Sequence, residues 1–446
     1  MTPDEPSPRP PVAPVLTALG IAALNPMQAA ALAAIRPGTD TFLVSPTGSG
    51  KTLGFLLPLT YLLRSDKAGV QCLVLVPSRE LALQLEQVWR KMATGFKVNV
   101  CYGGHAVETE MRNLSNPPAL LIGTPGRIAD HLTRRSFSTE TIETLVLDEF
   151  DKSLTMGFQQ EMGYIVENLP NLQTRVLASA TSGIQLPDFM RLHRPTTLRF
   201  EAEADVPTAL TLSLVRCQKP HDRDTLLRLL CTLGNEAVLI FCNLRETVEA
   251  LTQWLNSQGL HATAYHGALE QEARERALIR FRGGSVTYLV TTDLAARGLD
   301  IPDMNHVIHY ELPAHPTEFT HRNGRTARMH ATGTAYVLLE TGDPGPFYLP
   351  PNVPEFTLPT PTPPLPAPPA YTTIYISGGK KNKINKVDIV GFFTQKGGLP
   401  KEAIGRLEVG DFMAFAAVHR ECVADLLSRV QTEKMKGKKY KIDVAR

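Results

Sequence analysis

The sequence of 446 residues has no long hydrophobic run, no paired cysteines and little net charge. No apolar stretch approaches the roughly 20 residues that a membrane-spanning helix needs, so we expect no membrane association. The proline-rich N-terminus, MTPDEPSPRPPVAP, lacks the apolar segment and cleavage site of a signal peptide, which favours a cytoplasmic protein. The six cysteines are scattered without a CxxC pair or a neighbouring histidine cluster, which argues against a zinc site or a disulfide framework.

The small net charge of +2 conceals an uneven distribution. Residues 371–446 carry 15 Lys and Arg against 8 Asp and Glu, whereas residues 1–370 carry 31 against 36. A basic module on a mildly acidic body indicates a surface that binds a polyanion, although a merely soluble basic domain has the same composition.

Short apolar runs alternate with amphipathic helical patterns twice along the chain. The runs TFLVS, QCLVLV, VNVCY, ALLIGT, TLVLDE and TRVLASA occupy about residues 13–205, and LSLVRC, AVLIFCN, HATAYH, VTYLVTT, HVIHYEL and TAYVLLE occupy about 206–342. Runs of four to seven apolar residues bounded by turn residues are typical of strands in a buried parallel sheet. Two such series predict two α/β domains.

Two further segments complete the predicted organisation, with residues 1–12 expected to be disordered. Residues 343–370 contain 12 prolines and read as a semi-rigid spacer, or alternatively as a proline-rich ligand for a partner domain. Residues 371–446 read as strand, helix, strand, strand, helix, strand, which is the α+β order of a ferredoxin-like sandwich used by many RNA-binding domains.

The first strand runs directly into SPTGSGKT and an apolar helix, which is the setting of a Walker A phosphate loop. Gly48 and Gly50 let the backbone wrap phosphates, and Lys51 can reach the β and γ phosphates. The loop predicted to bind ATP comprises Ser45, Thr47, Gly48, Ser49, Gly50, Lys51 and Thr52. Its first position is Ser45 where the pattern has Gly.

Two carboxylates, Asp148 and Glu149, end the apolar strand TLVLDE about 100 residues after the loop. Asp148, through water, and the Thr52 hydroxyl are candidate Mg²⁺ ligands, and Glu149 can polarise the attacking water. Phosphoryl transfer also needs positive charge at the γ phosphate. Arg325 and Arg328 in HRNGRTAR are three residues apart, which predicts that they project from one face of a helical turn.

With these residues in place, the chain resembles the DEAD-box RNA helicases over about residues 14–340. The first domain contains, in the family's order, PSRELA (77–82), the Gly103-Gly104 doublet, TPGR (124–127), DEFD (148–151) and SAT (179–181). The second contains LIFCN (239–243), HG and QEAR (266–274), TTDLAARGLD (291–300) and HRNGRTAR (321–328). The resemblance implies two tandem RecA-like parallel-sheet domains and an RNA-dependent ATPase that uses ATP and Mg²⁺.

The resemblance also implies residue roles. Gln28 matches the glutamine that reads adenine, Asp300 the residue that holds the ribose, and Arg325 and Arg328 the arginine fingers. Ser179, Thr181 and Asp151 match the residues that couple hydrolysis to strand separation. The matched contacts to the RNA backbone are Arg79, Gly104, Thr124, Arg127, Thr292 and Asp293.

The C-terminal module resembles the RNA-binding domain of the DbpA subgroup of these helicases, in SGGKKNKINKVDIVGFF, IGRLEV and KMKGKKYKIDV. Members of that subgroup recognise a hairpin of large-subunit ribosomal RNA and act in ribosome assembly, so this resemblance implies the same RNA and a pre-ribosomal particle as partners. The candidate RNA-binding lysines are Lys380, Lys381, Lys383, Lys436, Lys438 and Lys439. We expect a monomer in which the proline-rich segment tethers this module to the helicase core.

The sequence departs from the family pattern at several positions. Phe150 stands in DEFD where the family has Ala, so either the local packing is adapted or the coupling between ATP and RNA is altered. The aromatic residue that usually precedes the adenine-reading glutamine is replaced by prolines, which predicts weaker stacking on the base. Tyr375 and Phe415 are either base-stacking residues on an exposed sheet face or part of a core.

The sequence therefore predicts a helicase that binds ATP between two α/β domains, closes on RNA and opens a few base pairs. Two alternatives remain at this point. One is a non-hydrolysing ATP-gated RNA clamp, if Phe150 disables hydrolysis, and the other is a DNA-directed translocase with the same core.

Overall fold

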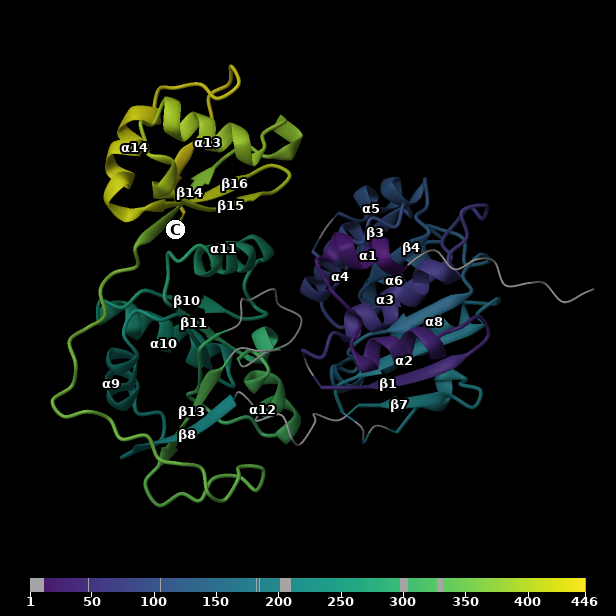
Figure 1. Ribbon diagram of the computed structural model, residues 1–446, viewed down its shortest axis with the longest axis horizontal. Helices are drawn as coiled ribbons and strands as arrows, with labels where there is room; N and C mark the ends of the chain where they lie inside the picture. Colours follow the sequence, from purple (N-terminus) through teal and green to yellow (C-terminus); the bar gives the residue numbers. More distant parts are fainter. Residues whose placement is uncertain are drawn as a thin grey trace, which may run out of the picture. The chain divides into compact units, whose positions relative to one another are not determined.

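The computed structural model describes residues 12–445 except 47, 105, 182, 184, 201–209, 297–303 and 327–331. Within these residues the chain divides near residue 207 into two compact units. The first unit is one α/β domain, and the second contains another α/β domain followed by the C-terminal domain (Figure 1). No helix of the described residues is long and apolar enough to cross a membrane.

The first domain is built on a seven-stranded sheet in the order β3-β4-β2-β5-β6-β1-β7, and all its pairs are parallel. The strands are β1 (Asp40–Val44), β2 (Cys72–Leu75), β3 (Val98–Cys101), β4 (Leu120–Gly123), β5 (Thr144–Leu147), β6 (Thr174–Ser179) and β7 (Thr196–Arg199). All six predicted strands are confirmed. The edge strand β7 was missed because TTLR is largely exposed and has no apolar run.

Helices cover both faces of this sheet (Figure 1). They are α1 (Val12–Leu19), α2 (Pro26–Ala34), α3 (Lys51–Leu62), α4 (Arg79–Lys91), α5 (Val107–Leu114), α6 (Pro125–Thr133), α7 (Phe150–Thr155) and α8 (Gln159–Glu167), with a 3₁₀ turn η1 (Asp188–Met190). Alternate strand residues point to opposite faces. Cys72 and Val74 therefore pack with α2, α3 and α4, whereas Leu73 and Leu75 pack with α5, α6, α7 and α8.

The second domain has a six-stranded parallel sheet in the order β10-β11-β9-β12-β13-β8. Its strands are β8 (Leu210–Cys217), β9 (Val238–Phe241), β10 (Ala262–Tyr265), β11 (Tyr288–Thr291), β12 (His306–His309) and β13 (Gly333–Glu340). Its helices are α9 (Arg223–Leu233), α10 (Arg245–Ser257), α11 (Gln271–Arg282) and α12 (Pro316–Asn323), with a 3₁₀ turn η2 (Asp293–Ala296). The two predicted parallel-sheet domains are thus confirmed.

The C-terminal domain is a four-stranded antiparallel sheet, β15-β16-β14-β17, with both helices on one face (Figure 1). Its elements are β14 (Tyr371–Ile376), α13 (Lys386–Gln395), β15 (Ile404–Val409), β16 (Ala414–His419), α14 (Val423–Val430) and β17 (Ile442–Val444), with 3₁₀ turns η3 (Lys380–Asn382), η4 (Lys401–Ala403) and η5 (Arg420–Cys422). The order confirms the predicted ferredoxin-like plan.

The proline-rich segment 343–370 forms no helix or strand, as its composition predicts, but it packs along the second domain. The Leu214 N–H of the edge strand β8 donates to the Pro354 carbonyl (2.9 Å), and the Phe356 N–H donates to the Leu214 carbonyl (2.7 Å). The Phe356 ring lies edge-on to Tyr336 at 5.3 Å. The edge of β8 offers unpaired backbone groups, and an extended chain satisfies them. The segment is therefore more than a spacer.

Phe150, the unusual residue of DEFD, is the first residue of α7 and has no exposed surface. It belongs to the hydrophobic cluster beneath α6 and α8, together with Leu147 and Ile165. This placement supports the alternative in which local packing accommodates the larger side chain.

We therefore predict that Phe150→Ala destabilises the first domain by about 3–5 kcal/mol, because it leaves a cavity in a packed cluster. The free energy of unfolding can be measured by urea titration with Trp89 fluorescence after Trp254→Phe removes the other tryptophan. Phe150→Leu is the matched control and should cost less than about 1.5 kcal/mol. A loss of stability below about 1 kcal/mol for the alanine variant would show that the cluster does not depend on this ring.

Candidate functional site

The predicted site residues of the first domain gather at one edge of its sheet. Because every pair is parallel, the carboxyl ends of all strands lie along that edge, where open α/β sheets bind ligands. Residues that follow β1, β5 and β6 carry the predicted ATP chemistry, and those that follow β2, β3 and β4 carry the predicted RNA contacts. The strand order β3-β4-β2-β5-β6-β1 places these two groups next to each other along the edge.

The phosphate loop leads from β1 into the N-terminus of α3. Gly48 and Gly50 both have a φ of +84°, a conformation that favours glycine. The first N–H groups of a helix have no intrahelical acceptor and point outward, which suits a phosphate. The buried Ser49 Oγ has no hydrogen-bond partner within the described residues, so it too can donate to a phosphate oxygen. Thr47 lies outside the described residues.

Lys51 and Asp148 lie within electrostatic range of each other beside this loop. The Lys51 ammonium donates to the Pro46 carbonyl at 2.7 Å and also to the Ser45 carbonyl. Burial raises the pKa of the Asp148 carboxyl to about 7, the neighbouring Glu149 contributes to the rise, and Lys51 opposes it. A buried carboxylate that lacks sufficient positive charge around it is a fitting ligand for a divalent cation. Thr52, on the first turn of α3, is the second predicted ligand.

Glu149 occupies an unusual backbone conformation at the end of β5. Its φ is +46°, which is rare outside glycine and concentrates at functional sites. Its N–H donates to Asp148 Oδ1 at 2.9 Å. Its Oε2 atom is buried without a hydrogen bond in the described part of the chain, although Lys152 Nζ lies 3.9 Å away. A carboxylate oxygen in this position can accept a hydrogen bond from water.

The three predicted coupling residues are brought together by hydrogen bonds. The Thr181 N–H donates to Ser179 Oγ at 3.0 Å, and the Thr181 hydroxyl donates to Asp151 Oδ2 at 3.3 Å. The Ser45 N–H donates to the Ser179 carbonyl at 3.1 Å. A continuous set of contacts therefore joins the phosphate loop, the turn after β6 and the helix that follows Glu149.

Gln28 is fixed against the phosphate loop. Its N–H donates to Asn25 Oδ1 (2.8 Å) and its Oε1 accepts from the Asn25 N–H (3.1 Å), which together cap α2. Its Nε2 donates to the Gly50 carbonyl at 3.3 Å, and the Asn25 side chain donates to the Ser49 carbonyl at 2.9 Å. Asn25 was not singled out in the sequence, although an Asn before Pro at a helix start is a recognisable cap.

Two of the predicted RNA contacts meet beyond β2 and β3. The Arg79 guanidinium lies 4.4 Å from the centre of the Tyr102 ring. Gly104 has a φ of +90°, and a Cβ atom there would lie 3.0 Å from Arg79 Nη1. Gly104 is thus required both for the backbone turn and for the approach of the arginine.

Arg127 follows β4 beside a buried network that the sequence analysis missed. Its Nη1 atom lies 3.6 Å from Glu110 Oε2, which is also 2.8 Å from His131 Nε2. Glu110 accepts from the Tyr102 N–H at 3.1 Å as well. Cys101, Glu110 and His131 are close enough to ligate a metal, but the neighbouring arginine already supplies the compensating charge. The sequence does contain one signal for this network. Glu110 stands four residues before Leu114 on α5, so the two residues share one face of the helix and are buried together.

Thr124, the fourth predicted contact, is the residue before α6. Its N–H donates to the Cys101 carbonyl at 3.1 Å, and its side chain makes no capping hydrogen bond. The structure therefore places Arg79, Gly104, Thr124 and Arg127 along the β3, β4 and β2 part of the edge.

In the second domain, Thr292 and Asp293 line an open hollow of about 680 Å³ at the carboxyl ends of β9, β10 and β11. The Asp293 carboxylate accepts from Arg322 Nε (2.6 Å) and Nη2 (3.1 Å). Arg322, which has no exposed surface, also donates to Asn243 Oδ1 at 2.8 Å. Arg322 lies in HRNGRTAR but carries no predicted role, and it joins the loops after β9 and β11, which both line the hollow.

The predicted helical turn for the two arginine fingers is wrong at Arg325. Helix α12 ends at Asn323 with Gly324 as its cap, and Arg325 lies in the turn that follows. The Met304 N–H donates to the Arg325 carbonyl (3.1 Å), and this pairing draws the backbone out of the helix. Arg328 and Asp300 lie outside the described residues.

The six candidate lysines of the C-terminal domain come from two connections between its elements. The connection from β14 to α13 carries Lys380, Lys381 and Lys383, and the connection from α14 to β17 carries Lys436, Lys438 and Lys439. The Lys436 ammonium bonds the Lys383 carbonyl and the Asp388 carboxylate, both at 2.7 Å. The two connections therefore lie side by side and form one basic surface, the lysine loops.

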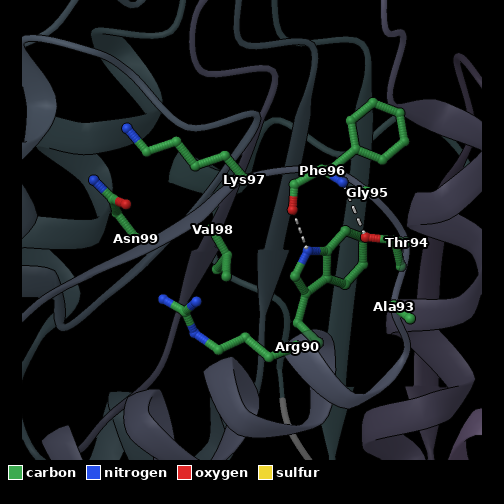
Figure 2. Close-up of a pocket in the computed structure, with 9 residues that line it drawn as sticks. Arg90, Ala93, Thr94, Gly95, Phe96, Lys97, Val98 and Asn99 are labelled. Carbon is green, nitrogen blue, oxygen red and sulfur yellow. Dashed lines mark hydrogen bonds between the residues drawn. The ribbon is translucent and has the colours of Figure 1, made fainter. Parts of the chain in front are cut away.

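A separate hollow of about 470 Å³ lies between the end of α4 and the start of β3, at the other edge of the first sheet (Figure 2). The indole of Trp89 donates to the Phe96 carbonyl at 3.2 Å beside it. None of the predicted ATP or RNA residues lines this hollow.

Comparisons with known proteins agree with this geometry. Family models for the DEAD/DEAH box helicase, the helicase conserved C-terminal domain and the DbpA RNA binding domain match residues 25–188, 222–330 and 373–444. ATP-dependent RNA helicase DbpA of Escherichia coli is 32% identical over 436 residues, which cover 96% of this chain and 95% of that protein.

Two further comparisons each cover about three quarters of this chain. ATP-dependent RNA helicase CshA of Listeria monocytogenes is 34% identical over 335 residues, covering 73% of this chain and 64% of that protein. The solved structure of S. cerevisiae Dbp5 bound to RNA and ADP BeF3 has a TM-score of 0.65 and 27% identity, and covers 73% of this chain and 86% of that one.

The raised pKa of Asp148 makes stability depend on pH. Between pH 3.8 and about 7 the folded protein holds a proton on this carboxyl that the unfolded chain has released, so stability falls as pH rises. Without nucleotide or Mg²⁺, Asp148→Asn should therefore become more stable than the parent by roughly 4 kcal/mol as pH rises from about 4 to 8. Urea titrations across this range measure the difference. Asp130→Asn is the control, because Arg134 lowers the pKa of that exposed carboxyl. A pH-independent difference for Asp148→Asn would contradict the assignment.

Proposed function

Because the chain belongs to the family of DEAD-box ATP-dependent RNA helicases, we propose that it hydrolyses ATP in response to RNA and opens short RNA duplexes. The observation that carries this proposal is the hydrogen-bonded set Ser45, Ser179, Thr181 and Asp151. These residues join the phosphate loop to the helix that begins beside Glu149. Binding of nucleotide and the arrangement of the catalytic carboxylates therefore depend on the same contacts.

The residues around the phosphate loop fit ATP with Mg²⁺. The loop's N–H groups, Ser49 and Lys51 would hold the phosphates, and Thr52 and Asp148 would hold the cation directly or through water. The bound cation supplies positive charge to the phosphate oxygens. Gln28, whose amide offers both a donor and an acceptor, would read the adenine edge, and Asp300 would hold the ribose.

Glu149 would orient and polarise the water that attacks the γ phosphate. Its buried Oε2 atom lacks a hydrogen bond within the described residues, so it can accept the proton of that water. Arg325 and Arg328 of the second domain would stabilise the charge that develops on the phosphate oxygens. Asp148 and Glu149 are both present, and Phe150 is buried in a hydrophobic cluster. We therefore expect Phe150 to leave the hydrolysis of ATP intact.

RNA would be held mainly through its backbone, by Arg79, Gly104, Thr124 and Arg127 in the first domain and by Thr292 and Asp293 in the second. Contacts to phosphate and sugar carry no direct sequence information, so the core should be nearly blind to sequence. A closed core fits single-stranded or bent RNA better than duplex, and so ATP-driven closure would open a few base pairs. Hydrolysis would then release the RNA.

The C-terminal domain would supply the choice of target. Its resemblance to the DbpA RNA-binding domain leads us to propose a hairpin of large-subunit ribosomal RNA as the target, ribosome assembly as the process and a pre-ribosomal particle as the partner. The lysine loops, with six ammonium groups in two adjacent connections, support a site for a phosphate backbone. We propose further that the protein acts as a cytoplasmic monomer.

The test of the catalytic assignment is Glu149→Gln. Its rate of ATP hydrolysis with saturating RNA should fall by roughly 100-fold or more, because the base is removed, while the Kd for ATP changes little. Glu167→Gln on the exposed end of α8 is the matched control and should keep the parent rate. Normal hydrolysis by Glu149→Gln would remove this residue from the mechanism.

The parent protein separates the remaining alternatives in the same assay. Binding of ATP without any hydrolysis would favour an RNA clamp, and equal stimulation by DNA and RNA would favour a DNA translocase.

The target assignment predicts stronger stimulation of ATP hydrolysis by large-subunit ribosomal RNA than by an unrelated RNA at equal nucleotide concentration. Changing Lys380, Lys381, Lys438 and Lys439 to Gln should remove this preference. The slope of log affinity against log salt should also become shallower, by about one for each phosphate that a lysine no longer binds. Lys396→Gln with Lys401→Gln, near the other end of α13, is the control. Equal stimulation by both RNAs in the parent would contradict the ribosomal target and leave the helicase assignment intact.

A further inference from the structure

The sheet of the C-terminal domain has an open face that its own helices do not cover. Ile374 and Ile376 of β14 point into the core with the helices, so their neighbours Thr373 and Tyr375 point the other way. Tyr375 pairs across the sheet with Phe415, with ring centres 5.7 Å apart. In many RNA-binding domains of this plan, aromatic residues on this face stack on bases.

Part of this open face is nevertheless buried. Only 4% of Phe415 and 2% of Thr373 and Ala417 is exposed. These three residues do not belong to the hydrophobic cluster between the sheet and its helices. Something outside the domain therefore covers them.

For Thr373 and Ala417, the covering element is the turn after α11 of the second domain. A Cβ atom on Gly283 would lie 3.4 Å from Thr373 Oγ1 and 3.5 Å from Ala417 Cβ. Ser285, which is 8% exposed, shares a short hydrogen bond with the Thr373 hydroxyl. The glycine and the small serine allow the backbone of this turn to lie directly on the sheet.

An ion pair flanks the covered area. Arg282, the last residue of α11, donates from Nη2 to Glu408 Oε2 of β15 at 3.0 Å. The two side chains are 14% and 25% exposed, so solvent only partly screens the pair. Arg406 donates to the other oxygen of Glu408 at 3.0 Å and completes its hydrogen bonding.

The proline-rich segment joins the same two domains from another side. Its middle is bound to β8 through Leu214, and its end is bound to the C-terminal domain. There Arg420 donates through its N–H to the Ala370 carbonyl and through Nε to the Pro369 carbonyl, both at 2.7 Å. The segment is therefore anchored to the second domain at its middle and to the C-terminal domain at its end.

From these contacts we propose that the open sheet face of the C-terminal domain is a docking surface for the second domain of the same chain, not a base-stacking surface for RNA. The second and C-terminal domains then move as one body. RNA reaches the C-terminal domain through the lysine loops, which follow β14 and precede β17 and are not covered by the α11 turn.

If the C-terminal domain selects the target RNA, as the proposed function holds, its docking determines where that RNA lies relative to the second domain. RNA bound at the lysine loops is carried by the second domain in whatever movement that domain makes. The distance from the target hairpin to the duplex that is opened is then fixed by the fold, whereas a flexible tether would allow a range of distances.

The docking contact can be tested by a disulfide in the full-length chain. In a Cys422→Ser background, which removes the one native cysteine that is not buried, Ser285→Cys and Thr373→Cys place two thiols across the contact. The control pair is Ser285→Cys with Ser428→Cys, because Ser428 is exposed on α14, on the helical face of the sheet. Cross-linking under mild oxidation is measured by mass spectrometry at several protein concentrations.

We expect the docking pair to cross-link at least tenfold faster than the control pair, at a rate independent of protein concentration. Equal rates for the two pairs would overturn the docking surface. The cross-linked protein should bind a large-subunit ribosomal RNA fragment with a Kd within twofold of the reduced protein. A tenfold weaker affinity that a reductant restores would show that RNA needs the open face, and would also overturn the proposal.

ATP hydrolysis by the reduced variant distinguishes a failure of the docking proposal from a failure of the proposed function. If the reduced variant hydrolyses ATP in response to RNA, a failed cross-link contradicts the docking alone. If neither the reduced variant nor the parent does so, the proposed function fails whatever the cross-linking shows.

Discussion

Parallel pairing of the strands in the first domain is the constraint on which the proposed chemistry depends. It directs the carboxyl end of every strand to one edge, so that turns distant in sequence meet there. A single antiparallel strand in the middle of the sheet would send its turn to the other edge. The strand order then sorts these turns, with the proposed ATP residues after β1, β5 and β6 and the proposed RNA residues after β2, β3 and β4.

The residues that follow β1, β5 and β6 are linked to one another by hydrogen bonds and share one buried charge. Thr181 bonds both Ser179 and Asp151 and so joins the turn after β6 to the first turn of α7. Burial raises the pKa of Asp148 to about 7, and the positive charge of Lys51 opposes the rise. The charge on Asp148 and the hydrogen bonds of Thr181 belong to one packed site. Such a site suits a change between two discrete arrangements.

Much of this fold follows from local sequence patterns, because a strand buried on both faces must be apolar throughout. The runs LVLVP, LLIGT and LVLDE could therefore be placed without knowledge of their partners. Edge strand β7 broke that pattern, since exposed TTLR resembles a loop. Arg325 was assigned a helical turn from spacing alone, yet its backbone pairs with Met304, an interaction that spacing does not reveal.

Contacts between surfaces distant in sequence were beyond prediction. Glu110 and Arg127 come from different helices, and the sequence shows only two isolated charges. The docking of Thr373 on Ser285 joins residues 88 positions apart whose side chains are common on protein surfaces. The proline-rich composition of residues 343–370 correctly predicted that this segment forms no helix or strand of its own. Its pairing with β8 could not be predicted, because it depends on that strand being at the edge of its sheet.

The central claim is that ATP and RNA stabilise the same arrangement of the chain. The most direct test is the Kd for a single-stranded RNA, measured with and without a non-hydrolysable ATP analogue and Mg²⁺. The account predicts that the nucleotide tightens RNA binding roughly 5- to 150-fold, and that RNA tightens nucleotide binding by the same factor. An RNA affinity that is the same with and without the nucleotide would contradict it.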